Sequence, residues 1–119
     1  MICDFGDVVV VAFPFVDRPI AKVRPAVVLS KQDFNAANDH SVLAMITTGA
    51  RSAWPSDIEI RDRAGAGIDH RSVVRWKLFT LPNQLITRPI GKLGAADRAA
   101  VARTARSSLA AQSRQRSPK

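Results

Sequence analysis

Residues 6–29 read GDVVVVAFPFVDRPIAKVRPAVVL and decide the fold class of the chain. The β-branched run Val8–Phe13 follows a Gly-Asp turn signal and predicts a buried strand. A second apolar run begins after Pro25, which has no backbone N–H and therefore suits the start of a strand or a sheet edge. The connection of roughly ten residues is longer than most hairpin loops. The stretch therefore predicts two strands of a mainly β protein.

Four further segments carry strand patterns, and two shorter ones predict connections. The strand segments are Val42–Ile46, Asp57–Ile60, Ser72–Trp76 with an optional extension to Phe79, and Pro89–Leu93. The connections are Lys31–His40, which fits a short helix or turn, and Gly65–His70, which fits a turn. Five or six short strands in one small chain indicate a closed or nearly closed barrel.

The chain changes character after its last predicted strand. Residues from Ala95 to about Ala111 are rich in alanine and predict a helix, in which Val101, Ala105 and Leu109 form one apolar stripe. Residues 112–119 are polar and basic, and we expect them to fray. We therefore expect one domain over residues 1–111 with a basic tail.

The positive charge is concentrated in the last third of the sequence. The chain of 119 residues has a net charge of +8, and 46% hydrophobic residues are enough for one core. Residues 87–119 hold eight basic residues against Asp97, which leaves only +1 for residues 1–86. Such a basic region attracts nucleic acid, acidic protein or anionic lipid without distinguishing among them.

Two features of the sequence favour the cytoplasm. Cys3 is the only cysteine, which excludes a disulfide framework within the chain and suits a reducing compartment. We expect its thiol to be inert. The apolar run Val8–Phe13 is too short to span a bilayer, and no basic residues precede it as they would in a signal peptide. We therefore expect no membrane association.

Most common catalytic and cofactor motifs are missing from the sequence. Gly65-Ala66-Gly67 lacks the remaining residues of a phosphate-binding loop. Asp57 and Glu59 would share one strand face. The neighbouring residues offer too few further ligands for a metal ion, so we expect this face to be solvated instead. We therefore expect neither a metal site nor a cofactor.

Two histidines suggest a ribonuclease that uses one imidazole as base and the other as acid. His40 and His70 each lie in a predicted loop beside an aspartate. Nothing in the sequence brings the two together, and exposed loop histidines are common. The sequence therefore favours two unrelated surface residues.

A more informative set lies at the ends of predicted strands. Arg24 begins one strand, Thr47 and Thr48 end another, and Arg75 lies within a third. Arginine offers a permanent charge and a planar set of donors that suit a phosphate, and a threonine hydroxyl can add a hydrogen bond. The alternative is structural: Arg24 would pair with Asp7 or Asp17 while the threonines cap a turn, and spacing by itself favours it.

Several motifs, taken in order, resemble one known family. Gly6–Phe15 and Arg24–Ser30 look like the opening of the MazF/PemK (Kid) family of toxin ribonucleases. The likeness continues through the strand that ends in Thr47, the segment Ser72–Arg75 and Ile90–Leu93 before the final helix. It covers residues 6 to about 110.

The resemblance implies an SH3-like barrel of five to seven strands that dimerises and cuts single-stranded RNA at short sequences. It implies that Arg24 acts in acid–base or electrostatic catalysis and that Thr47 stabilises the transition state, with no metal required. The RNA 2′-hydroxyl would attack the phosphate, so DNA would not be cut. The expected RNA-binding residues are Arg75, Lys77, Thr48, Lys22 and Arg51.

Two departures from the family pattern bear on activity. The loop before Arg24 differs from that of many relatives, so the cleavage sequence cannot be carried over. In the PemK branch an Asp lies two residues after the strand Arg, whereas here that position holds Lys77. Arg75 therefore fits a phosphate-binding role better than acid–base catalysis, and a structural role stays open.

The resemblance also predicts partners and leaves two alternative functions open. We expect a homodimer and a MazE- or PemI-like antitoxin with an acidic segment, which would provide the only link to DNA. Trp54 and Trp76 are candidates for that interface, although Trp76 suits the core equally. The alternatives are a CcdB-type toxin that targets gyrase on the same barrel and an inactive nucleic-acid-binding barrel.

Overall fold

The computed structural model describes residues 1–13, 22–48 and 53–110 of the chain. Its strands are β1 (Asp7–Phe13), β2 (Lys22–Val28), β3 (His40–Thr48), β4 (Ile58–Glu59), β5 (Ser72–Pro82) and β6 (Ile86–Lys92). Its helices are α1 (Gln32–Asn38), α2 (Arg63–Ala66) and α3 (Ala95–Ser108), and a 3-10 turn, η1, spans Asn83–Leu85. The predicted mainly β fold with a C-terminal helix is confirmed.

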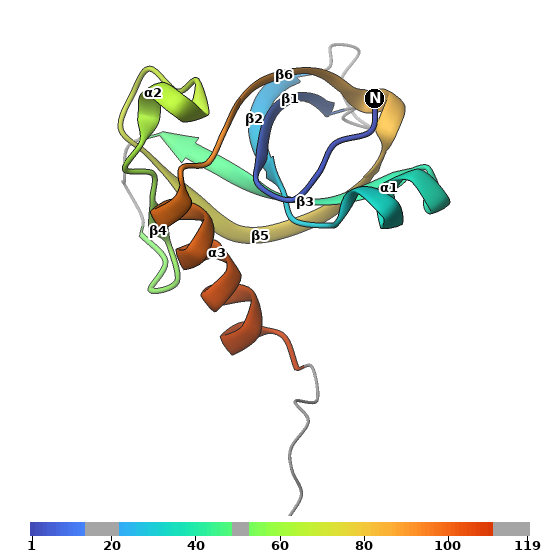
Figure 1. Cartoon of the computed structure of the whole chain (residues 1–119). Coiled ribbons are helices and arrows are strands. Elements are labelled where there is room, and N and C mark those ends of the chain that lie inside the picture. The colour runs from blue at the N-terminus through green and yellow to red at the C-terminus, as the bar shows by residue number, and fades with distance from the viewer. Residues whose placement is uncertain (14–21, 49–52, 111–119) are drawn as a thin grey trace, which may run out of the picture.

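The six strands form one antiparallel sheet in the order β4-β5-β3-β2-β1-β6. The sheet is strongly curved: β1, β2 and β6 curl over the long strands β3 and β5 (Figure 1). Helix α2, which follows the edge strand β4, packs against the other edge strand, β6. The contact is so close that a Cβ atom at Gly91 would collide with the backbone of Ala66. The two edges of the sheet are thereby linked.

Both faces of the sheet are buried, which explains why its strands are apolar at consecutive positions. Val8 and Val27 belong to one core cluster, together with Val101 of α3. Val9 and Val28 belong to the second cluster. Since alternate residues of a strand point to opposite faces, an unbroken valine run fills both cores at about 1.5–3 kcal/mol for each side chain buried.

Helix α3 is attached to the sheet only by its first turns. The Asp97 side chain is buried, and its Oδ2 accepts hydrogen bonds from the backbone N–H groups of Arg61 and Asp62, each at 2.9 Å. Val101 is buried too, but Leu109 is 49% exposed, and Figure 1 shows the helix running away from the sheet. The prediction that Leu109 completes an apolar stripe is therefore wrong.

Three local predictions change. The predicted turn at Gly65 is the helix α2, because Asp62 Oδ1 caps it by accepting from the Gly65 N–H at 3.0 Å. The strand β5 continues to Pro82, beyond the predicted extension. Asp57 precedes β4 rather than lying within it.

Two further observations concern the single cysteine and the search for membrane-spanning helices. Cys3 is buried, and burial raises the pKa of its thiol, as expected for an inert cysteine. Over the described ranges, no helix combines the length and apolar character needed to cross a bilayer. The predicted basic tail, residues 112–119, lies outside the described residues.

Candidate active site

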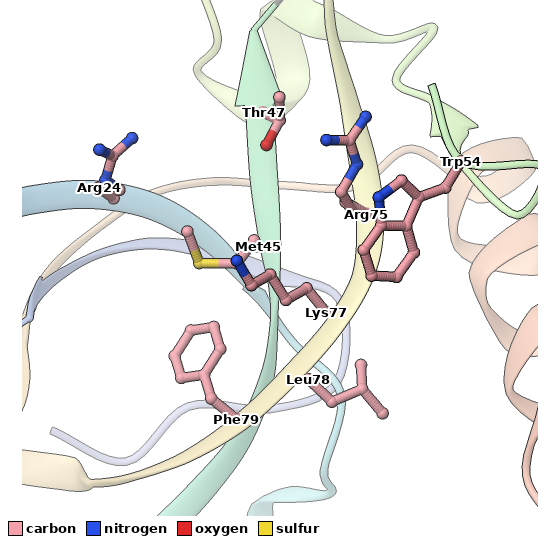
Figure 2. A pocket seen from close by; sticks show the side chains of 8 residues that line it. All are labelled: Arg24, Met45, Thr47, Trp54, Arg75, Lys77, Leu78 and Phe79. Atoms are coloured by element: carbon pink, nitrogen blue, oxygen red, sulfur yellow. The ribbon is translucent and has the colours of Figure 1, made fainter. Parts of the chain in front are cut away.

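The ends of three neighbouring strands form the candidate site. The ladder between β2 and β3 joins Ala26–Val28 to Leu43–Met45, and both strands continue beyond it. Arg24 lies on the continuation of β2 and Thr47 on that of β3, while Thr47 pairs on its other side with Val73 of β5. Figure 2 shows Arg24, Thr47 and Arg75 carried by these three strands. The fold therefore places the predicted catalytic residues on adjacent strands.

These strand ends line a cavity of about 500 Å³. The lining residues are Arg24, Met45, Thr47, Trp54, Arg75, Lys77, Leu78 and Phe79. Three of these side chains are cations and none is a carboxylate, while the others are apolar apart from Thr47. A ligand with an anionic group and a flat apolar part matches this combination.

A β-bulge shapes one wall of the cavity. Ala44 pairs with Leu78 but the next residue, Met45, pairs with Arg75, so Trp76 and Lys77 have no partner on β3. Bulges break the strict alternation of side chains and redirect them, often next to active sites. Lys77 of the bulge lines the cavity together with Leu78 and Phe79, which follow it on β5.

Arg75 is held in place by Asp57 and Trp54. Its Nε and Nη2 donate to Asp57 Oδ1 and Oδ2 at 3.1 and 2.9 Å, and the two side chains are only 13% and 9% exposed. The Arg75 guanidinium holds the pKa of Asp57 below its ordinary value and Asp57 raises the pKa of Arg75. The guanidinium also lies 5.6 Å from the centroid of the Trp54 ring. Arg75 is thus an oriented group whose charge is balanced by Asp57.

Arg24 stands in contrast to Arg75. It is exposed, and it forms no ion pair with any carboxylate of the described residues. Asp7, one of its two proposed structural partners, instead lies 3.8 Å from Lys92 Nζ. The Asp7 alternative is therefore wrong, and Asp17 lies outside the described residues. No carboxylate of the described residues neutralises Arg24 in an ion pair, and its side chain lines the cavity.

A second hollow, of about 440 Å³, lies on the other side of Arg24 and Thr47. Its polar lining includes Thr48, His70 and Ser72, and it shares Arg24 and Thr47 with the first cavity. The Ser72 hydroxyl donates to the His70 carbonyl oxygen at 2.9 Å and so ties the His70 backbone to the start of β5. Arg24 and Thr47 therefore lie between two hollows, as residues acting on a chain-like ligand would.

The two histidines do not form a catalytic pair. His40 begins β3 opposite Pro82, whereas His70 is two residues before Ser72, which pairs with Thr48 at the end of β3. Strands rise about 3.3 Å per residue, so the length of β3 separates the two histidines. Only His70 lies near the predicted catalytic residues.

Three predictions remain: the RNA-binding residues Lys22 and Arg51 and the expected absence of a metal site. Lys22 begins β2, whose first residues lead to Arg24. Arg51 lies outside the described residues. No group of three or more His, Cys, Asp or Glu side chains suited to holding a metal ion occurs in the part of the chain that the structure describes.

Two residues of the site lie in places that the sequence did not indicate. Asp57 was expected on a solvated face with Glu59, but only Glu59 is solvent-exposed, in an ion pair with Arg71 at 3.3 Å. Trp54 was expected at a partner interface, and it lines the cavity. Asp57 and Trp54 both precede β4, so no strand periodicity indicates where their side chains lie. Their role depends on contact with Arg75, which is distant in sequence.

The comparison with known proteins agrees with this architecture. A family model described as the PemK-like, MazF-like toxin of type II toxin-antitoxin system matches residues 4–109. No curated protein matches the chain.

Several solved structures share the fold. A chain of the MazE–MazF complex from Deinococcus radiodurans is 18% identical with a TM-score of 0.69, over 94% of this chain and 99% of that one. The Mycobacterium tuberculosis toxin MazF-mt6 is 22% identical with a TM-score of 0.62, over 81% and 90%. An endoribonuclease in complex with its cognate antitoxin, from a mycobacterial species, is 13% identical with a TM-score of 0.65, over 88% and 90%. With the family model spanning nearly all of the sequence, the chain belongs to the PemK-like, MazF-like toxin family of type II toxin–antitoxin systems.

Proposed function

We propose that this toxin is a metal-independent endoribonuclease that cleaves single-stranded RNA between the two hollows. The observation that carries the proposal is the position of Arg24 and Thr47, which line both hollows. A phosphodiester at this point would meet an arginine without a carboxylate partner among the described residues and a threonine hydroxyl. The nucleotides on its two sides would extend into the two hollows.

The reaction that suits these groups is transesterification by the RNA itself. The 2′-hydroxyl oxygen attacks phosphorus and loses its proton, while the bond from phosphorus to the 5′-oxygen breaks and that oxygen gains a proton. The products are a 2′,3′-cyclic phosphate and a 5′-hydroxyl end. Arg24 stabilises the charge that builds on the phosphoryl oxygens or assists proton transfer, and Thr47 donates a hydrogen bond to the same group.

The other predicted binding residues would act along the RNA strand. Lys77 adds a cation to the wall of the first cavity, and Thr48 adds a hydroxyl to the second hollow. Arg75 contributes a guanidinium of fixed orientation, and Lys22 and Arg51 remain proposed contacts. We further propose a homodimer in the cytoplasm, silenced by an antitoxin whose acidic segment competes for the same cations.

The test is an incubation of the purified protein with RNA of mixed sequence in EDTA. We expect cleavage products that end in a cyclic phosphate, and we expect no cleavage of the matching DNA. Arg24→Ala should lower kcat by about 100-fold or more, because it removes the main charge stabilisation at the phosphate. Thr47→Ala should lower it by a smaller factor.

Two matched variants separate local chemistry from general loss of charge or folding. Arg88→Ala removes an exposed arginine of β6, and Thr80→Ala removes an exposed threonine of β5; neither lines the cavity. Both should cleave like the original protein. Full activity of Arg24→Ala would refute the assigned site. RNA binding without strand breaks would support the inactive barrel, and growth arrest with intact mRNA would support the gyrase-type toxin.

A further inference from the structure

Trp54 is an exposed aromatic side chain within the candidate active site. It is 40% exposed, and it lines the same cavity as Arg24 and Thr47 (Figure 2). Burial of so large an apolar side chain in the core would stabilise the fold. A tryptophan left open at a strand-end cavity is therefore available to a ligand.

The position of Trp54 is fixed by two kinds of contact. Its backbone N–H donates to Asp57 Oδ2 at 2.9 Å, and its carbonyl oxygen accepts from the Asp57 N–H at 3.0 Å. The Arg75 guanidinium lies over one face of its ring, and the same Asp57 carboxylate holds that guanidinium. One nearly buried carboxylate thus holds both the Trp54 backbone and the guanidinium that contacts the indole, which limits the conformational entropy that the ring loses on binding.

A nucleobase is the ligand that best fits the exposed part of this ring. Bases stack on tryptophan regardless of sequence, because every base has a π face. The cations Arg24 and Lys77 of the same cavity suit the phosphates on either side of a base. Met45, Leu78 and Phe79 add apolar surface to the same cavity, which suits the ring faces of bases.

We propose that Trp54 is the stacking platform for one base of the RNA, next to the phosphate held by Arg24 and Thr47. The assignment rests on the proposed function, because it takes single-stranded RNA as the ligand. Arg75 and Asp57 then act as positioning residues for the indole. The base lies in the first cavity, and the strand continues past Arg24 into the second hollow.

Binding can be measured without cleavage. Single-stranded oligodeoxynucleotide hexamers of mixed sequence have no 2′-hydroxyl and so cannot undergo 2′-hydroxyl attack, and hexamers of abasic deoxyribose phosphate provide the same charge without bases. We expect the base-containing hexamer, but not the abasic one, to quench the fluorescence of Trp54. Trp54→Ala should weaken binding of the base-containing hexamer by about tenfold and leave binding of the abasic hexamer unchanged.

Two further variants test whether stacking is the cause. Trp54→Phe keeps an aromatic face and should retain most of the affinity for the base-containing hexamer. Phe34→Ala removes an aromatic residue of α1 that is exposed to a similar extent, 44%, but does not line the cavity, and it should bind both hexamers normally. Thermal unfolding of each variant checks that the fold is retained.

The outcomes separate this assignment from the proposed function. Equal weakening of both hexamers by Trp54→Ala, or no weakening of either, would overturn the stacking assignment even if RNA is cleaved. Selective loss of base-dependent binding in a protein that cleaves no RNA would retain the platform and overturn the endoribonuclease. For a protein that cleaves, an abasic substitution at one position of a cleavable RNA should raise KM in the original protein but not in Trp54→Ala.

Discussion

Asp57 connects the stability of the site to its chemistry. The carboxylate is 9% exposed and receives two hydrogen bonds from Arg75 and one from the Trp54 backbone. Removing one partner of such a pair leaves the other without compensation in a poorly hydrated place. The lost stability should therefore exceed that of a surface pair such as Arg71 and Glu59.

We predict that Asp57→Asn lowers the midpoint of thermal unfolding by several degrees at pH 7. Arg75 lowers the pKa of Asp57 below its ordinary value of 3.8, so the folded state favours the ionised carboxylate. The pair therefore stabilises the protein above pH 3.8, and the gain disappears as the pH falls through the pKa of the folded state. Calorimetry from pH 7 to pH 3 should show the original protein and the variant converging. A constant difference down to pH 3 would contradict this.

The two histidines offer a matched comparison. His70 lines the second hollow beside Arg24 and Thr47, whereas His40 lies at the far end of β3. We predict that His70→Ala raises KM for RNA by about 2- to 10-fold, as expected for one lost hydrogen bond to the strand. His40→Ala should have the original KM. Steady-state cleavage of one RNA by the two variants is the measurement, and equal behaviour would exclude the second hollow from the binding path.

The strands were predictable because their continuous apolar runs fit a sheet that is buried on both faces. The valine run of β1 and the apolar run of β2 each fill two cores, so β propensity and burial agree. Arg24 and Thr47 could be located because they lie at the ends of such runs. The order of the strands and the pairing of their ends come from contacts distant in sequence, which one sequence does not encode locally.

Sequence periodicity could not predict the bulge in β5 or the role of the segment before β4. A bulge changes the register by inserting residues on one strand, and its position depends on the partner strand, here at Ala44 and Met45. Asp57 acquires its role only when Arg75 comes within hydrogen-bonding distance. The resemblance named Lys77 as the departure from the family pattern, but it did not reveal that a carboxylate from another segment reaches Arg75.

Asp97 joins α3 to the connection between β4 and α2. Its carboxylate accepts from two backbone N–H groups, those of Arg61 and Asp62, in a buried setting. We predict that Asp97→Ala lowers the free energy of unfolding by about 1–3 kcal/mol, because both donors lose their acceptor away from water. Asp97→Asn keeps an amide oxygen and should lose less. Urea unfolding followed by circular dichroism measures both, and an unchanged midpoint for Asp97→Ala would mean that water replaces the carboxylate.

The net positive charge of the chain is distributed unevenly between its first two thirds and its last third. Residues 1–86 carry the candidate site and are almost neutral, at +1, whereas residues 87–119 carry +7. Arg75 is balanced by Asp57, so the local field at the proposed phosphate site comes mainly from Arg24 and Lys77. The exposed arginines Arg103 and Arg106 lie on the later turns of α3, which lead away from the sheet.

This division predicts that attraction and chemistry can be separated by truncation. Residues 112–119 contain three cations, Arg114, Arg116 and Lys119. If they contact RNA phosphates, their deletion should reduce the slope of log binding constant against log salt concentration by up to about 2, since each contact on a single strand contributes about 0.7. RNA binding at low salt should weaken, while kcat at saturating RNA should remain that of the full chain. Loss of cleavage at saturating RNA would instead place part of the catalytic machinery in the tail and not at the strand ends.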